Sequence, residues 1–385
     1  MSTLKVGGIR GVSASSDAIT VANDGTCTAN ITNNLSNRNK IRNGAMQVSQ
    51  RAGSFTGTSN EYTLDGFLHS TGSSYNFDTT TTQAADAPDG FNKSLKITPD
   101  STTAPTGGQN GLIETFLEGQ FLQDLAYGTS SAKSFTLSWY AKSSSQNANH
   151  QYTLWMQHYN SGGNRFIQNR SFVVTASWQR FSITIPGNTS ENIIDDHTLG
   201  LRIGWILTSG PDDIQSEKTT WTDSNFFRAV TGQSDFMDNT SNEFYLTGVQ
   251  LEVGSVLTDF EHLGLDRELK RCQRYYFKLP YQGTCNGGGF MLGSGKETGS
   301  SARICIIFPA PMRVIPSCAA SNLLSDDESS ATSANTINQV LASNTEPDRA
   351  RVQFTGGSYS GGNATSLTTS QTTDTFLEAN AELLN

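Results

Sequence analysis

Short runs in which apolar and polar residues alternate recur along most of this chain, and segments rich in Gly, Asn and Ser separate them. Alternation with a period of two places every second side chain on the same face of an extended strand. Several such strands separated by turns predict an all-β fold, an antiparallel jelly-roll sandwich over residues 41–262. The clearest runs are residues 135–141, 152–156, 178–185, 199–207 and 244–253.

The composition agrees with a folded, β-rich chain. Of its 385 residues, 35% are hydrophobic and only 16% are charged, and 20 Phe, 11 Tyr and 5 Trp supply bulk for a core. The low charge argues against disorder. The formal net charge of −9 and the absence of a basic run argue against nucleic acid as a partner.

The two ends of the sandwich region differ from it in character. In residues 1–40, Ile19 and Val21 face Cys27, Ala29 and Ile31 across an Asn-Asp-Gly turn, which predicts a β-hairpin. A lone hairpin is marginal in water, so we expect this arm to fold against another chain. Residues 281–385 hold Gly-rich segments and strand-like runs, which predict a smaller distal β domain.

Two segments have helical spacing. The run LIETFLEGQFLQDL (residues 112–125) predicts a helix with one broad apolar face. A second helix is predicted from 266 to 276, within a junction of residues 263–280. Its apolar stripe contains Leu265, Leu269, Cys272 and Tyr276. That stripe must be buried, either against other copies of the chain in an oligomer or against its own sandwich.

Signals for targeting and for disulfides are missing. The sequence from residue 1 has no apolar core typical of a secretory signal, and no apolar run is long enough for a membrane span. The five cysteines form no CxxC pair, which favours free thiols. We therefore expect synthesis in a cytoplasm, with no signal peptide and no membrane span.

Catalytic motifs are also missing, and we predict no catalytic residue and no cofactor. The sequence has no GxSxG, no HExxH and no P-loop, and its five histidines lack metal-ligand spacing. Glu114 and Glu118 lie one turn apart on the first predicted helix, but exposed helical glutamates are usually a solvated face. Asp212 and Asp213 are the residues at which calcium could bind, although acidic pairs usually mark turns.

Candidate ligand contacts are aromatic residues next to polar ones, because sugar-binding sites place aromatic faces against pyranose rings. In the sandwich these candidates are Trp155, Tyr159 and Trp221, whereas Trp139, Trp178 and Trp205 are expected in the core. In the distal loops the candidates are Asn286, Phe290 and Tyr359. Each of these residues could equally be structural, in a core or a turn.

The strand GVQLEVGSVLTDFEH followed by ELKRCQRYYFK resembles a signature of phage tail-fibre and related virion proteins. Other pieces match in order over roughly residues 1–280, among them RNGAMQVSQRAGSF, YTLDGF, ASWQRFSITIPGNTS and NEFYLTG. The opening LKVGGIRGVSASSDAIT resembles the segment by which such proteins join a virion, and the last hundred residues resemble the family only loosely.

The resemblance implies a non-enzymatic virion fibre protein made in the host cytoplasm. Its jelly roll would be similar to carbohydrate-binding modules. Residues 1–40, including Ile19, Val21 and Ile31, would attach it to tail or capsid proteins. Homotrimers would present the distal loops to a host glycan or protein, and trimer formation follows from the resemblance alone. Two alternatives stay open: an adaptor, head fibre or decoration protein that contacts only virion proteins, and a carbohydrate-active enzyme.

Overall fold

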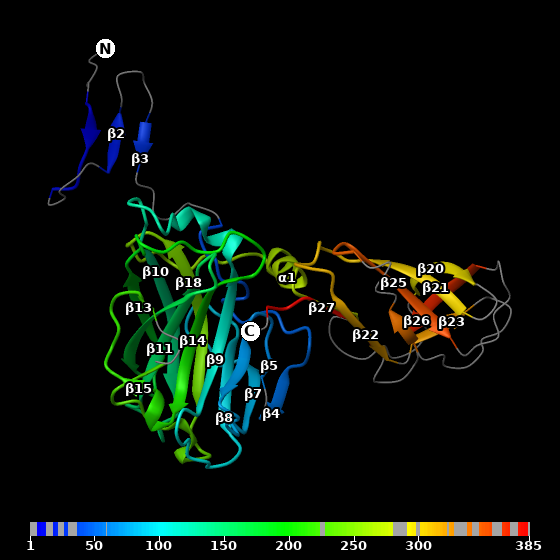
Figure 1. The fold of residues 1–385 in the computed structure, drawn as a ribbon, viewed down its shortest axis with the longest axis horizontal. Helices are drawn as coiled ribbons and strands as arrows, with labels where there is room; N and C mark the ends of the chain where they lie inside the picture. Colours follow the sequence, from blue (N-terminus) through cyan, green and yellow to red (C-terminus); the bar gives the residue numbers. More distant parts are fainter. Residues whose placement is uncertain are drawn as a thin grey trace.

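A computed structural model of the chain describes residues 6–12, 18–21, 27–29, 37–58, 60–223, 228–279, 291–297, 301–321, 323–326, 337–340, 346–355, 364–369 and 376–383. Regular structure in these residues is almost entirely β-strand (Figure 1), which confirms the predicted all-β class. The exceptions are one α-helix and three short 3-10 helices: α1 (Leu265–Gln273), η1 (Gly119–Leu125), η2 (Pro211–Asp213) and η3 (Phe236–Asp238). Within the described ranges, no helix is long and apolar enough to cross a bilayer.

Two antiparallel sheets form the sandwich. The six-stranded sheet has the order β13 (Gln179–Ile185), β10 (Phe135–Ser143), β18 (Phe244–Val253), β8 (Ser94–Pro99), β7 (Thr79–Ala84), β4 (Ser54–Gly57). The seven-stranded sheet has the order β16 (Thr222–Asp223), β12 (Arg165–Val173), β11 (Gln151–Tyr159), β14 (Leu199–Ser209), β9 (Asn110–Glu118), β6 (Leu68–Gly72), β5 (Glu61–Tyr62). All five clear alternating runs of the sequence are strands here.

The chain passes back and forth between these sheets. The strand β4 belongs to the first sheet, β5 and β6 to the second, β7 and β8 to the first, β9 to the second and β10 to the first again. Such crossing between two facing antiparallel sheets is jelly-roll connectivity, and it confirms the predicted sandwich. The inward-facing side chains of both sheets form one core, which includes Trp139, Tyr152, Trp205, Phe135 and Phe244.

Residues 112–125 are not the helix that the sequence predicted. They form the strand β9 and then the 3-10 helix η1. Every residue of β9 is buried, because the core covers one face of this central strand and other segments cover the other. A strand buried on both faces loses the alternation that normally identifies it. Gly119 ends the strand where a Cβ atom would lie 1.9 Å from the carbonyl oxygen of Ile194.

The N-terminal arm is a three-stranded antiparallel sheet, β1 (Gly8–Ile9), β2 (Ile19–Val21) and β3 (Cys27–Ala29), which projects from one end of the sandwich (Figure 1). Ile19 pairs with Ala29 and Val21 with Cys27, so the predicted hairpin is confirmed. Its turn and Ile31 lie outside the described residues.

Two further antiparallel sheets follow α1, as the sequence predicted for a distal β region. One has the order β19 (Tyr276–Leu279), β27 (Phe376–Asn380), β22 (Ser317–Ser321). The other has the order β23 (Leu323–Asp326), β26 (Ala364–Thr369), β20 (Met291–Glu297), β21 (Ser301–Ile307), β25 (Arg349–Thr355), β24 (Ile337–Val340). Figure 1 shows them extending sideways from the sandwich beyond α1.

The last described residues return to the sandwich. The Tyr62 hydroxyl donates to the carbonyl oxygen of Leu383, and the side chain of Glu382 forms ion pairs with Arg42 at 2.6 Å and Arg51 at 3.3 Å. The exposed fractions of the Arg42 and Glu382 side chains are only 5% and 1%. Because β27 also pairs with β19, the C-terminal segment joins the distal sheets to the jelly roll through buried contacts.

Candidate functional site

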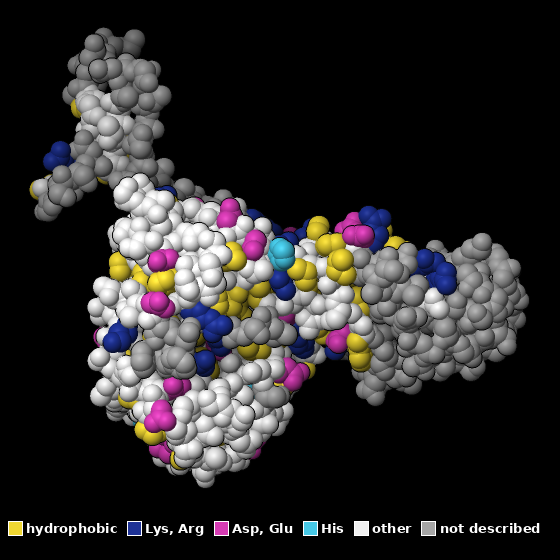
Figure 2. Space-filling model, viewed as in Figure 1, with side chains coloured by type: hydrophobic (Ala, Val, Ile, Leu, Met, Phe, Trp, Pro, Cys, Tyr) yellow, Lys and Arg dark blue, Asp and Glu magenta, His cyan; other side chains and the backbone are white. Residues whose placement is uncertain are grey.

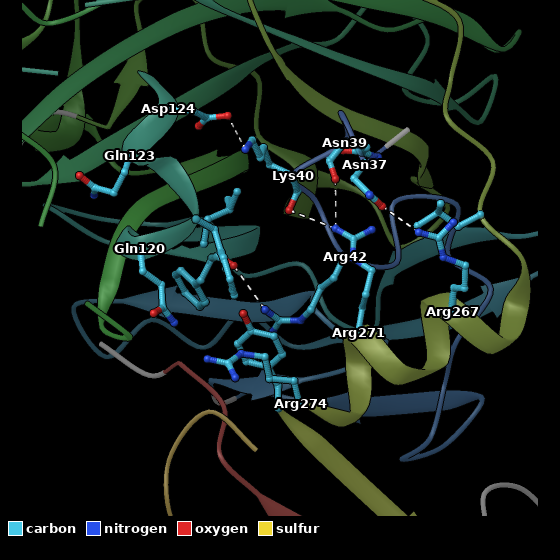
Figure 3. A pocket seen from close by; sticks show the side chains of 15 residues that line it. Asn37, Asn39, Lys40, Arg42, Gln120, Gln123, Asp124, Arg267, Arg271 and Arg274 are labelled. Carbon is cyan, nitrogen blue, oxygen red and sulfur yellow. Dashed lines mark hydrogen bonds and ion pairs between the residues drawn. The ribbon is translucent and has the colours of Figure 1, made fainter. Parts of the chain in front are cut away.

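A cavity of about 640 Å³ lies where the segment after the N-terminal arm, the 3-10 helix η1 and the helix α1 meet. Figure 3 shows Gln120, Gln123 and Asp124 of η1 on one side and Arg267 and Arg271 of α1 on the other. Five of the residues that line the cavity are cationic and one is acidic: Lys40, Arg42, Arg267, Arg271 and Arg274, and Asp124. For a chain with a net charge of −9, this is a local excess of positive charge. We call it the junction cavity.

Residues 37–40 form one wall of the junction cavity and are held by backbone contacts. The carboxylate of Glu261 accepts hydrogen bonds from the backbone N–H groups of Asn37 and Asn39. Arg271 donates to the carbonyl oxygens of Asn39 and Lys40 at 3.1 and 3.4 Å. The chain that leads out of the arm is therefore fastened to α1 and to the residues just before it.

Most of the cations in the junction cavity are paired with acids. Lys40 binds Asp124 at 2.7 Å, and Arg274 makes two hydrogen bonds of 2.8 Å to Glu118. Burial alone would raise the pKa of Glu118, but hydrogen bonds from Arg274 and Tyr275 lower it below its usual range. Burial would likewise lower the pKa of Arg42, but the attraction of Glu382 raises it. Glu118 and Arg42 therefore stay ionised near neutral pH.

The Glu114–Glu118 pair considered for acid–base chemistry does not lie on an exposed helical face. Both residues are in β9, and both are fully buried. Two nitrogens of Arg202 bind the two carboxylate oxygens of Glu114, and Arg274 does the same for Glu118. Each carboxylate is thus neutralised by a guanidinium group. The two glutamates support the structure of the sheet and of the junction.

The structure separates the predicted ligand contacts of the sandwich. Trp155 is only 1% exposed and packs under residues of the 210–230 segment, where β15 (Ile214–Gln215) pairs with β17 (Ala229–Val230), so it offers no face to a ligand here. Trp221 is half-buried against Tyr127 and His158, and its indole N–H donates to Pro186. Tyr159 keeps partial exposure beside Arg165. Asn286, Phe290 and Tyr359 lie outside the described residues.

Two of the three tryptophans that were predicted in the core lie in it. Trp139 and Trp205 are buried in it, as predicted. Trp178 is half-buried outside the core, near Tyr245 and the ammonium group of Lys142, and it donates to Asp86. It comes just before the edge strand β13, where an indole ring can lie along the surface of the sheet.

The apolar stripe proposed for an oligomer interface is mostly buried by other residues of the same chain. Cys272 is 1% exposed and Tyr276 is 3% exposed, because α1 packs on residues 39–43 and Tyr276 already belongs to β19. Leu269 is partly buried and Leu265 is 50% exposed. Cys272 is therefore buried by the packing of α1 on its own chain, and Tyr276 is buried within β19.

The predicted calcium pair lies in a turn. Asp212 and Asp213 form η2, and Asp213 accepts a hydrogen bond from Asn110 at 2.8 Å. Burial raises the pKa of Asp213, and the nearby charge of Arg228 only partly opposes this. Across the residues that the structure describes, no group of three or more His, Cys, Asp or Glu side chains could hold a metal ion.

The described cysteines are expected to react very differently with a thiol reagent. Cys272 is buried and its pKa is raised by burial, whereas Cys305 is exposed on β21. Thiolates are the reactive form, so a maleimide should label Cys305 in the native protein and Cys272 only after unfolding. Peptide mapping by mass spectrometry would check this. Rapid native labelling of Cys272 would contradict the packing of α1.

A second cavity, of about 400 Å³, lies between the sandwich edge and the sheet β19–β27–β22. Arg51, Glu61, Tyr62, Tyr276, Lys278 and Glu378 are among its lining residues. Its charges are of both signs, and the guanidinium group of Arg51 lies 3.6 Å from the ring centroid of Tyr276. This cavity therefore lacks the charge excess of the junction cavity.

Sequence reasoning did not identify the residues of the junction cavity. One signal was present: Lys40 and Arg42 are separated by one residue, as are cations on one side of an extended segment. The other signal was the spacing of Arg267 and Arg271, four residues apart, which puts both on one face of a helix. The sequence could not show that these two faces meet.

No family model matches the chain, and no curated protein matches it. Similar solved structures include the enzymatically active domain of tailspike protein 4 of bacteriophage CBA120, with 10% identity, a TM-score of 0.30, and coverage of 56% of this chain and 21% of that chain. Another is the xylan-binding CBM22-1 domain of Paenibacillus barcinonensis Xyn10C, with 10% identity, a TM-score of 0.28, and coverage of 53% and 94%. A third is a family 11 carbohydrate-binding module of a Clostridium thermocellum cellulase, with 11% identity, a TM-score of 0.27, and coverage of 55% and 99%. Likenesses this distant carry no functional inference for this chain.

Proposed function

We propose that this chain is a non-enzymatic virion fibre protein. Its N-terminal arm attaches to another virion protein, and its body, as a homotrimer, binds a glycan on the host surface. The observation that carries the proposal is the arm, whose strands are two or three residues long. A sheet of this size buries too little apolar surface to be stable alone in water.

The side chains of the arm support attachment to a partner. Val6, Ile9 and Val21 are 46%, 54% and 37% exposed, and Val12 is fully exposed. The arm also projects away from the sandwich instead of packing on it (Figure 1). Apolar side chains that find no cover in their own chain are expected to be covered by a partner. The resemblance to virion proteins makes that partner a tail or capsid protein.

The body supports glycan binding less directly. The visible face of the sandwich is mostly uncharged, with acidic and basic side chains scattered over it (Figure 2). The junction cavity combines guanidinium groups, amides and an exposed aromatic ring, which are the groups that bind sugars. The distal loops proposed from the sequence stay candidates, and the junction cavity is added to them.

An adaptor or decoration protein is the second candidate, and one observation favours it. Trp155 and Trp221, which were proposed as ligand contacts, are packed within the chain. If no other part of the body binds a glycan, the protein contacts only virion proteins. The third candidate, an enzyme, loses its proposed acid–base pair, because arginines neutralise Glu114 and Glu118.

Deleting residues 1–29 should leave a stable trimer that no longer joins the virion. This deletion removes β1 to β3 but keeps residues 37–40, which Glu261 and Arg271 hold. Light scattering after gel filtration gives the mass of both proteins, and incorporation into particles is measured beside it. Soluble full-length protein should also reduce adsorption of the phage to its host.

Three other outcomes would change the proposal. If both proteins are monomers, the fibre model is wrong and a decoration protein is favoured. If only the shortened protein loses its trimer, the arm is the assembly element. If the trimer joins the virion but does not compete for adsorption, the adaptor function replaces host binding.

A further inference from the structure

One cation of the junction cavity has no acidic partner in the described part of the chain. Lys40, Arg42, Arg271 and Arg274 each form an ion pair with a carboxylate. Arg267, in contrast, donates to the neutral amide oxygen of Asn37 at 2.8 Å, and its side chain is exposed. The cavity wall formed by α1 therefore carries a positive charge that its own partners do not balance.

Arg271 adds to this charge. It follows Arg267 by four residues on α1, so the two guanidinium groups project from the same face of the helix toward the cavity (Figure 3). The ion pair of Arg271 with Glu268 is long, at 3.4 Å, compared with the distances of strong guanidinium–carboxylate contacts. Like charges at this spacing destabilise a helix slightly, and a bound anion would relieve the repulsion.

An aromatic ring stands on the opposite side of the junction cavity. Phe121 of η1 lines the cavity and is 46% exposed, so its ring is open to a ligand there. The guanidinium group of Arg274 lies 5.4 Å from the centroid of its ring. Gln120 and Gln123, on the same 3-10 helix, are exposed at the cavity. An apolar ring face next to amide groups matches the C–H face and hydroxyl groups of a sugar.

From this arrangement we propose that the junction cavity binds an acidic saccharide, with its ring against Phe121 and its oxyanion at Arg267 and Arg271. The inference deepens the proposed glycan-binding function and rests on it. Planar guanidinium groups bind carboxylate and phosphate oxygens in pairs, so either kind of acidic sugar has the required chemistry. The volume of about 640 Å³ is within the usual range for small-ligand sites.

The test is calorimetric titration of the full-length protein with four probes. These are a galacturonic acid trisaccharide, a galactose trisaccharide of the same length, a trisaccharide phosphorylated at one sugar, and inorganic phosphate. At least one acidic trisaccharide should bind about tenfold more tightly than the neutral one, and added salt should weaken that binding. The two acidic probes show whether a carboxylate or a phosphate is preferred.

Three variants locate the binding. Arg267→Ala should weaken the acidic trisaccharide by about tenfold, because it removes one charged hydrogen-bond donor from the wall. Lys270→Ala is the matched control, since Lys270 is an exposed cation on the same helix that does not line the cavity, and binding should be unchanged. Phe121→Ala should weaken the trisaccharide but not inorganic phosphate. All three side chains are exposed, so the fold should be kept.

Equal binding of acidic and neutral trisaccharides would overturn the inference, as would unchanged binding after Arg267→Ala. Inorganic phosphate that binds as tightly as the acidic trisaccharides would show a simple anion site and would also overturn it. These results are independent of the fibre proposal. If the trimer competes for adsorption but does not bind acidic sugars, the fibre function stands and the cavity inference fails. If the protein binds acidic sugars but is absent from virions, the cavity inference stands and the fibre function fails.

Discussion

Glu382→Ala should lower the free energy of unfolding by about 3–5 kcal/mol, because it leaves the buried guanidinium group of Arg42 and the partly buried one of Arg51 without their carboxylate. The Glu382 side chain is 1% exposed and binds Arg42 at 2.6 Å and Arg51 at 3.3 Å. Denaturation by urea, followed by tryptophan fluorescence, measures the loss. The end of the chain should also become sensitive to proteases, since Leu383 and Ala381 are held beside Glu382.

Two controls separate the buried charge from other effects. Arg349→Ala breaks an exposed ion pair with Asp348 and should leave stability unchanged within error. Replacing both Arg42 and Glu382 by methionine removes the charges together, and it should recover much of the stability lost in Glu382→Ala. If Glu382→Ala is as stable as the wild type, the C-terminal segment does not join the two parts of the molecule in solution.

The sequence was sufficient to predict the strands that have one face in the core and the other face toward polar surroundings. Residues 135–141 and 152–156 show their period of two because their inner and outer neighbours differ in polarity. The hairpin of residues 19–29 was also predictable, since a turn signal and two short alternating runs are local features. Strand order and the hydrogen bond between Tyr62 and Leu383 depend on contacts between distant residues, which one sequence does not reveal.

The failures have a common physical cause. Residues 112–118 read as a helix because both faces of β9 are buried and their polarity no longer alternates. Glu114 and Glu118 were expected on a solvated face, and the sequence shows no nearby cation to pair with them. Their arginine partners lie 88 and 156 residues further along the chain. Trp155 seemed free to meet a ligand because the covering segment is likewise distant in sequence. In each case a long-range partner, invisible locally, determined the environment.

The junction cavity shows the same limit. Its walls come from residues 37–42, 116–124 and 263–275, three segments that are far apart in the sequence. The sequence shows that Arg267 and Arg271 are four residues apart, but this spacing is also typical of an ordinary solvated helix face. The structure shows that these two arginines face a concave surface on which Phe121 is exposed, and this surface makes them candidates for binding a ligand.

Glu114→Gln should be the most informative substitution in the sandwich, with an expected loss of about 3–5 kcal/mol. The glutamine has the same shape but no charge, so Arg202, which is 4% exposed, would be buried without a counter-ion. The centroid of the Trp155 ring lies 5.1 Å from the guanidinium carbon of Arg202 and 5.4 Å from that of Arg228, so both cations contact this ring. Burial and the charge of Arg202 already lower the pKa of Arg228. Removing the Glu114 carboxylate would leave Asp213 as the remaining nearby acid that attracts Arg228, and the repulsion between Arg202 and Arg228 would grow.

The same variant tests the enzyme alternative, because catalysis and structure predict different results. A structural Glu114 predicts lower stability in urea denaturation and no hydrolysis of host polysaccharide by either protein. The double variant Glu114→Met with Arg202→Met removes both charges and keeps apolar bulk, so it should be far more stable than Glu114→Gln. Release of reducing sugar by the wild-type protein, lost in Glu114→Gln without a change in stability, would reverse the assignment. Glu114 is fully buried and its carboxylate is held by the guanidinium group of Arg202, so a substrate in solvent cannot reach it, and we therefore expect the structural result.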